Sequence, residues 1–422
     1  LFIRDDETNF SEDTEFREIM LIAEKGHEEH QKTNYIRLQN LDADPGQIVN
    51  VCESLDIGET AERNDFRVQN VDTGTLNPQN LFTPFAVFNP GLLKTWEDII
   101  DSDKITELRN LDSGRIGGVR GGADDARGYN PQMAINAKDV YNIKDSDSWI
   151  LNRESESTVV AEQQHTGDGV NIPRGCLVPN LRGFSGRSKV DVSDLSEYAV
   201  IDRFNDFDFF ESLTDVEEIP VEDWRKKVES RVAHLALVRR ANLTAPGLQH
   251  MVYYSEKKRL GPNIMWMLSD LNQKEAKALA AWFDSTIGWL QFLLDRVETE
   301  GAFGAWRGYI VKHFKAPNLY SINQDNLQLL LDGFEEVRDV ETGSLVEQLA
   351  ANVDEGSMNK SDLRRFNRVY PDVELGVGLE ERRELDTNIL EFLNVPEDER
   401  DEILDDMYEN MLMELVLKKD IM

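Results

Sequence analysis

Two clusters of ionisable residues have side-chain types that could support metal-dependent chemistry. His27-Glu-Glu-His30 places two imidazoles three positions apart, whereas the helical zinc-protease motif needs them four positions apart on one face. We interpret this cluster as a solvated charged turn. Asp270 followed by Glu275-Ala-Lys277 has the residue types with which a nuclease holds magnesium near a scissile phosphate. Because helix packing already explains the apolar pattern around Lys277, a nuclease is the least favoured interpretation.

A glycine-rich segment from Ser113 to Ala123 could be compared with a phosphate-binding loop. It lacks the Gly-Lys-Ser/Thr ending of such loops, and no clear strand precedes it. We predict a flexible loop there.

The cysteines and the apolar segments limit the class of protein. Cys52 and Cys176 are far apart and lack any Cys-x-x-Cys or Cys/His ligand spacing, so the sequence predicts no metal site, no disulfide framework and a reducing compartment. No apolar stretch approaches the roughly 20 residues of a membrane span, and no charged-then-apolar leader opens the chain. We therefore expect a cytoplasmic protein with no membrane partner. Because the chain starts at Leu1 inside a charged segment, we expect it to be part of a longer protein.

The charge balance is strongly acidic. Lys and Arg total 46 against 80 Asp and Glu, a net charge of -34 in 422 residues. A disordered acidic chain would lack core-forming residues, but 40% of these residues are hydrophobic, with 7 Trp and 19 Phe. We interpret the composition as a folded, salt-adapted (halophilic) protein with an acidic surface.

Three windows of the sequence depart from this acidity. Residues 169–190 and 301–324 contain no acid, and residues 230–269 contain only Glu256. In chain order, the first window (169–190) carries a net charge of +4, the second (230–269) +5 and the third (301–324) +3, and the third also has the aromatic residues Trp306 and Tyr309. The cationic candidates in the windows are Arg174, Arg182, Arg187, Lys189, Arg239, Arg240, Lys257, Lys258, Arg259, Arg307, Lys312 and Lys315.

Basic surface with aromatic residues in acidic surroundings is typical of a polyanion-binding site, because phosphates need donors and repel carboxylates. Burial alone would explain the missing acids but not the net positive charge. At molar salt the Debye length is only about 3 Å, so affinity must depend on bonds to base edges, on DNA shape and on stacking. We predict that the three windows converge on one face and form a DNA cleft.

The elements that must position these residues are of mixed type. Apolar runs predict strands at 16–25, 157–161 and 198–201. Helical spacing predicts helices at 92–111, 224–240 and 272–294, the last capped by Asn272 or Asp270. Helical patterns dominate from Gln324 to Leu417, with a break at Pro396. The fold class is therefore α/β with mixed segments and a helical C-terminal part, of unknown sheet topology.

Two segments near the middle of the chain carry a family resemblance. Lys277-Ala-Leu-Ala-Ala-Trp-Phe-Asp-Ser-Thr-Ile-Gly288, followed by Arg296-Val-Glu-Thr-Glu-Gly301, resembles the target-recognition region of large adenine-specific DNA methyltransferases of restriction-modification and phage-exclusion systems. That family commonly has Asn where Asp284 stands and Arg where Glu300 stands. The resemblance adds Arg296 to the DNA-binding candidates, while Glu300 argues against a direct phosphate contact at the 296–301 turn.

Looser matches extend the resemblance over most of the chain. Residues 16–25 resemble the closing strand of the methyltransferase domain, 172–182 with 191–201 resemble the connector into the recognition core, and Arg382-Arg-Glu-Leu-Asp386 through Leu417 resembles the helical end. The implied organisation is a truncated methyltransferase exit at 1–35, a connector or first recognition subdomain at 36–150, a target-recognition core at 151–330 and a helical region at 331–422.

The catalytic residues of the family do not carry over. Adenine methylation needs an Asn/Asp-Pro-Pro-Tyr/Phe loop for the flipped base and a glycine-rich turn for S-adenosylmethionine. Asn77-Pro-Gln79 and Asn89-Pro-Gly91 have one proline each and are typical of turns. We expect no catalytic residue and no bound cofactor in this chain; S-adenosylmethionine is implied only for the longer enzyme.

The resemblance implies double-stranded DNA and a preceding methyltransferase domain as partners. The main alternative is a protein-interaction module of a phage-defence assembly. Arg364-Arg-Phe-Asn-Arg368 could contact phosphate or could be an exposed cluster at a helix end. The target sequence, the methylated base, DNA cleavage by the parent and the oligomeric state stay open.

Overall fold

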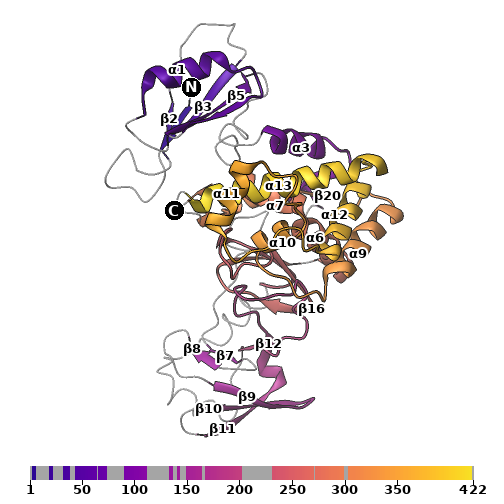
Figure 1. Cartoon of the computed structure of the whole chain (residues 1–422). Coiled ribbons are helices and arrows are strands. Elements are labelled where there is room, and N and C mark those ends of the chain that lie inside the picture. The colour runs from indigo at the N-terminus through magenta and orange to yellow at the C-terminus, as the bar shows by residue number, and fades with distance from the viewer. Residues whose placement is uncertain are drawn as a thin grey trace.

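The computed structural model describes residues 2–5, 19–21, 32–38, 43–63, 65–73, 90–111, 133–135, 140–142, 149–163, 167–201, 231–269, 271–298 and 303–420. Figure 1 shows an N-terminal sheet with one helix at one end, a large body of strands and helices in the middle, and a group of strands at the other end. The sheets are small and mostly antiparallel, and helices dominate the C-terminal region. The expected mixed α/β class with a helical C-terminal part is confirmed.

The N-terminal sheet has the strand order β2-β1-β3-β5-β4, with β1 and β3 parallel and the other pairs antiparallel. Helix α1 packs on β5, and its N-terminus is capped by the Asp44 carboxylate, which accepts a hydrogen bond from Gly46 N at 2.9 Å. The strand predicted at 16–25 is observed as β2 at the edge of this sheet. Its role as the closing strand of a methyltransferase domain stays a prediction. The elements are β1 (Phe2–Asp5), β2 (Ile19–Leu21), β3 (Lys32–Leu38), α1 (Pro45–Ser54), β4 (Thr60–Glu62) and β5 (Phe66–Asp72).

The strands at the other end form two sheets, ordered β11-β10-β9 and β12-β13-β7-β8. In β10, Val159 and Ala161 are buried and alternate with less buried neighbours, the period of a half-buried strand. The strands predicted at 157–161 and 198–201 are confirmed as β10 and β13. The elements are β7 (Met133–Ile135), β8 (Val140–Asn142), β9 (Trp149–Glu154), β10 (Thr158–Gln163), β11 (Gly169–Pro173), β12 (Leu177–Pro179) and β13 (Tyr198–Val200).

The middle body is built around strand β14 (Val232–Val238), which lies between β16 (Val252–Leu260) and β17 (Met265–Leu268). The helix predicted over 224–240 is therefore wrong from 232 onward, while 224–230 lie outside the described residues. A central strand buried on both faces has a continuous apolar run, here Leu235 to Val238. Periodicity cannot distinguish such a run from a buried helix.

The helix predicted over 92–111 is shorter than expected. Helix α3 spans Pro90–Ile100, and strand β6 (Ile105–Glu107) follows and pairs with β20 (Lys315–Pro317). A single 3₁₀ turn then covers Leu108–Asn110. The strand pairing with a partner about 200 positions away is a tertiary contact that local propensity does not contain.

The helix predicted over 272–294 is observed as two helices, α6 (Gln273–Asp284) and α7 (Thr286–Leu294). Asn272 caps α6 in a reciprocal capping box with Glu275. Ser285 ends α6 and also caps α7, because its hydroxyl accepts a hydrogen bond from Gly288 N at 3.1 Å. A Cβ at Gly288 would lie 2.3 Å from the Trp282 carbonyl oxygen, so this break needs glycine.

The C-terminal part contains α9 (Gln324–Val337), α10 (Leu345–Ala351), α11 (Lys360–Val369), α12 (Glu380–Phe392) and α13 (Glu397–Asp420). The predicted break at Pro396 is confirmed between α12 and α13. One hydrophobic core joins these helices to α3, α6, α7 and the β14 sheet, whereas α1 and β5 have a separate small core. No helix of the described residues has the length and apolar character needed to cross a bilayer.

Candidate nucleic-acid interface

The structure brings the three acid-poor windows into contact. The first window lies along β16 of the second, with Leu181 N donating to Leu260 O and Tyr254 N donating to Val190 O. The third window joins the second through β15 (Arg240–Asn242), which pairs with β19 (Phe303–Ala305). The three segments therefore adjoin through the second window, while a concave opening between their cations stays a prediction.

Four arginines and one tyrosine lie on or beside the sheet β15-β19-β18, in which β18 spans Val297–Glu298. We call Arg239, Arg240, Arg296, Arg307 and Tyr309 the β15–β19 patch. Arg240 and Arg307 are exposed. Tyr309, on the short helix α8 (Gly308–Val311), is 61% exposed. The patch therefore presents guanidinium groups and an aromatic ring to solvent.

A rigid layer of tryptophans supports this patch. Trp306 N donates to Arg239 O at 2.9 Å, and Trp306 Nε1 donates to Phe292 O at 2.8 Å. Trp266 Nε1 donates to Trp306 O at 2.8 Å, and the Arg239 guanidinium lies 5.4 Å from the Trp266 ring centroid. Trp306 is fully buried, so the prediction that it stacks on DNA bases is wrong: its ring fills the core, and both of its polar hydrogens are used inside the protein.

The other cations of the second window lie at the far end of the sheet. Arg259 pairs in register with Ala233 near the start of β14, whereas Arg239 and Arg240 follow its end. Seven residues of strand separate the two ends by about 20 Å. Lys257 and Lys258 are exposed at this far end, where the β14–β16 register shifts. They therefore belong to a separate surface from the β15–β19 patch.

The structure shows that the prediction of Arg259 as a DNA-binding residue is wrong. It is only 3% exposed, and its guanidinium donates to the carbonyl oxygens of Asn180, Ser193 and Leu195 at 3.0, 2.8 and 2.7 Å. Burial lowers the pKa of this guanidinium. Arg259 holds the 180–195 segment against β16 and does not face a ligand.

The cations of the first window divide between paired and exposed side chains. Arg174 donates to Glu154 at 2.5 Å and to Tyr198 at 3.1 Å. Arg187 forms an ion pair with Glu197, which is largely buried. Arg182 is exposed and Lys189 is partly exposed. Arg182 and Lys189 are thus the more accessible candidates from this window.

Lys312 and Lys315 follow the β15–β19 patch in the chain. Lys312 ends α8 and is partly exposed. Lys315 Nζ lies 3.8 Å from the Glu107 carboxylate. Burial alone would raise the pKa of Glu107, but hydrogen bonds from His313 and Arg109 outweigh it and lower that pKa. Its negative charge is thus retained beside Lys315, which weakens the local positive potential there.

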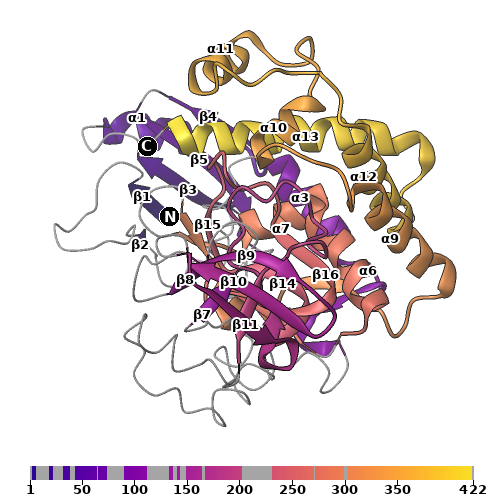
Figure 2. The same cartoon turned by 90° about the horizontal axis from the view of Figure 1, so that it is seen from below.

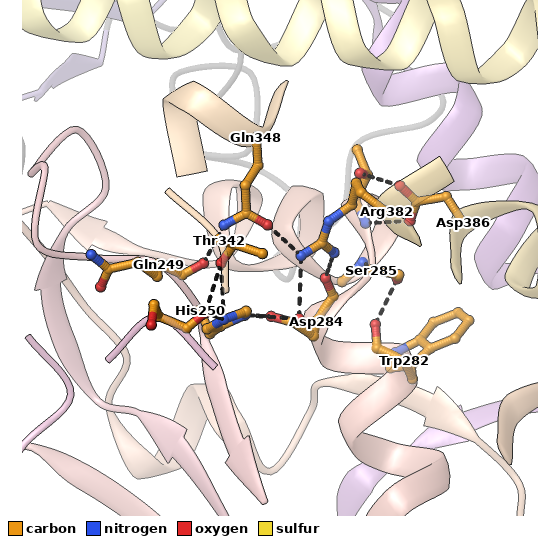
Figure 3. Close-up of polar contacts among 12 residues, drawn as sticks. Gln249, His250, Trp282, Asp284, Ser285, Thr342, Gln348, Arg382 and Asp386 are labelled. Atoms are coloured by element: carbon orange, nitrogen blue, oxygen red, sulfur yellow. Dashed lines mark hydrogen bonds and ion pairs between the residues drawn. The ribbon is translucent and has the colours of Figure 1, made fainter. Parts of the chain in front are cut away.

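A buried polar network links α6, α10 and α12 (Figure 3). Asp284, fully buried at the end of α6, has its Oδ2 3.0 Å from His250 Nδ1 and 3.2 Å from Arg382 Nη2. Arg382, on α12, also donates to the Asp284 main-chain carbonyl and to Gln348 Oε1, the latter at 2.7 Å. Its guanidinium lies 4.1 Å from the centroid of the Trp289 ring.

A second carboxylate one turn along α12 completes the network. Asp386 accepts hydrogen bonds from Thr286 N at 2.7 Å, from Thr286 Oγ1 at 2.6 Å and from Tyr408 OH at 2.8 Å. Burial raises the pKa of Asp386, an effect that Arg382 and Thr286 oppose. The start of α7 is thus tied to α12 and α13. Because Arg382 and Asp284 are almost completely buried, the network joins α6 and α7 to the C-terminal helices and offers no surface to a ligand.

Sequence reasoning did not predict this network, although it singled out both halves. The motif ending in Asp284-Ser-Thr and the motif Arg382-Arg-Glu-Leu-Asp386 were treated as separate resemblances, 98 positions apart. The only local signal was the carboxylate at 284 in a segment otherwise typical of a core helix, because a buried charge needs a partner.

The residues weighed for nuclease chemistry have other partners. Glu275 closes the capping box of α6, and Lys277 Nζ lies 2.5 Å from Glu335. Asp270, His27-Glu-Glu-His30 and the 113–123 segment lie outside the described residues. In the described part of the chain, no group of three or more His, Cys, Asp or Glu side chains has an arrangement that could hold a metal ion.

Comparison with known proteins gives little. No protein-family model matches the chain. No curated protein matches it. Among solved structures, the type IIG restriction endonuclease BpuSI is similar with a TM-score of 0.40 and 14% sequence identity, over 90% of this chain and 40% of that endonuclease.

Proposed function

We propose that this chain recognises double-stranded DNA in a sequence-specific manner, as the target-recognition part of an adenine-specific DNA methyltransferase of the restriction-modification or phage-exclusion type. The observation that carries the proposal is the β15–β19 patch. In a chain with a net charge of -34, two exposed arginines, Arg240 and Arg307, and the 61% exposed Tyr309 lie on or just after the strands of one small sheet.

The side-chain chemistry of the patch fits this role. Arginine presents a planar fork of donors that matches guanine O6 and N7, and it also binds phosphate. A tyrosine ring can stack on a base or pack against a deoxyribose. Arg240 and Arg307 supply the exposed forks, and Tyr309 supplies the ring.

The tryptophan layer under the patch favours specificity. Base readout depends on donors that are fixed before binding, because ordering a mobile side chain costs about 0.5–1.5 kcal/mol. The main chain at Arg239 is bonded to Trp306, and the Arg239 side chain donates to Asn263 O at 3.0 Å. The strand that presents Arg240 is thus anchored in the core from both sides.

The experiment compares Arg307→Ala with Lys94→Ala, a control at an exposed position on helix α3. Binding to duplex DNA is measured by fluorescence anisotropy over a range of potassium chloride concentrations. If Arg307 contacts phosphate, its loss reduces the slope of log K against log salt by about one; if it reads a base, specificity relaxes by about 1–3 kcal/mol at one position. Lys94→Ala leaves both unchanged.

Wild-type protein that binds no duplex at any salt concentration at which it is folded contradicts the proposal. That result would favour the alternative, a module whose main partner is protein. Binding that is identical in wild type and Arg307→Ala would move the interface away from this patch.

A further inference from the structure

Helix α11 carries a second group of exposed cations outside the three acid-poor windows. Lys360, Arg364 and Arg368 follow each other at intervals of four residues, and all three are exposed. Side chains four positions apart lie on the same helix face, separated by about 6 Å along the axis. The helix therefore presents a basic stripe to solvent.

The opposite face of α11 is firmly anchored. Phe366 is fully buried, and its ring lies 6.1 Å from that of Tyr370, which ends the helix. The helix packs on α13, and Lys419 Nζ near the end of α13 lies 4.0 Å from the centroid of the Tyr370 ring. Figure 2 shows α11 at the outer edge of the molecule, beside α13. The basic stripe thus sits on a fixed element.

The anchor also connects α11 to the β15–β19 patch. Phe366 of α11 and Tyr370 belong to the same hydrophobic core as Ala241 of β15 and the following Leu243. The helix and the strand that carries Arg240 are thus parts of one packed body.

We infer that the Lys360–Arg364–Arg368 face of α11 binds the phosphate backbone of the same DNA duplex that the β15–β19 patch reads. This inference rests on the proposed function. The face carries cations and the polar residue Asn367 but no acid, and no large apolar side chain is exposed on it. Such a face supplies charge and position without base selection. The acidic residues Asp354, Glu355, Asp372 and Glu374 flank the helix in sequence, which confines the favourable potential to the stripe.

The expected effect depends on salt. Each phosphate contact contributes about 0.9 to the slope of log K against log salt. One contact therefore increases the affinity about fourfold at about 0.2 M salt and hardly at all at about 1 M. Arg364→Glu should therefore weaken binding to every duplex sequence at least about fourfold at about 0.2 M, and Lys360→Glu/Arg364→Glu about 15-fold, with less than about twofold change at about 1 M.

The test measures affinities for a duplex of about 40 base pairs in both salts, with circular dichroism confirming that each variant is folded. Lys94→Glu on α3 is the matched control, since it reverses one exposed mid-helix charge, and it should leave affinity unchanged. If wild type binds but Arg364→Glu behaves like Lys94→Glu, α11 is not a DNA-binding face and the proposed function still stands. If wild type does not bind DNA, both proposals are wrong.

Discussion

Replacing Arg382 with methionine tests whether the buried network holds α6 and α7 to the C-terminal helices. The substitution removes a cation that is 1% exposed, its bonds to Asp284 and Gln348 and its stacking on Trp289. Methionine keeps most of the apolar volume, so the cavity term is small. What is left behind is the Asp284 carboxylate, fully buried and facing only His250. Removing one partner of a buried ion pair costs about 3–5 kcal/mol, a large part of a typical stability of about 5–15 kcal/mol.

The neighbouring Arg383 provides a matched control on the same helix. It bonds Asp401 and Asp405, each at 2.8 Å and both largely exposed, and exposed pairs contribute about 0–1 kcal/mol. Urea unfolding at constant molar potassium chloride should show Arg382→Met destabilised by about 3–5 kcal/mol and Arg383→Met by less than about 1 kcal/mol. If Arg382→Met yields no folded protein, Arg382→Lys, which keeps the charge but loses the fork, should fall between these values. Equal stability losses in the two methionine variants would refute the reasoning.

Four further outcomes follow from the structure. Burial raises the pKa of Asp295 from 3.8 in the unfolded chain to about 6, so loss of its proton destabilises the folded state, fully above about pH 6 and not at all below about pH 4. Asp295→Asn should therefore be more stable than wild type by at most about 3 kcal/mol at neutral pH. In urea titrations this difference should shrink as the pH falls from about 6 to about 4. Thermal midpoints of the wild type should rise from low salt to molar potassium chloride because screening relieves the repulsion of the net -34 charge; a flat curve would remove the salt-adaptation argument. Trp306→Ala should cost about 3–5 kcal/mol of stability, whereas Tyr309→Ala should keep the thermal midpoint and weaken DNA binding. A loss of stability in Tyr309→Ala but not in Trp306→Ala would contradict the assigned burial of the two rings. Lys312→Ala should reduce the salt slope of binding by about one without changing sequence preference, which anisotropy titrations on several duplexes would check.

Local signals in the sequence predicted the elements that depend on local contacts. The cap at Asn272, the strand at 157–161 and the break at Pro396 each depend on a few neighbouring residues, and all three were found. The two errors in secondary structure have a common cause. Strand β14 and strand β6 are strands because distant partners, β16 and β20, pair with them, and an apolar run carries no record of its partner.

The charge pattern predicted which segments meet but not which side chains face outward. The three windows do adjoin, although their strands belong to different sheets and their cations do not all lie on one face. Within a window, however, Arg240 and Arg259 are indistinguishable by composition, and only packing shows that the first is exposed and the second is bonded to three carbonyl oxygens. The same applies to Trp306 and Tyr309, three residues apart, one fully buried and one 61% exposed.

Selection of duplexes from a pool of random sequences tests the central claim, sequence-specific recognition of DNA, most directly. The folded wild-type chain is incubated with the pool in about 1 M potassium chloride, where nonspecific phosphate binding is weak, and bound duplexes are amplified and sequenced over several rounds. The account predicts enrichment of one defined motif, with a relaxed base preference at one position for the variant that lacks the base-reading arginine of the β15–β19 patch, Arg240 or Arg307. Recovery of no motif from wild-type protein that is folded under these conditions would contradict it.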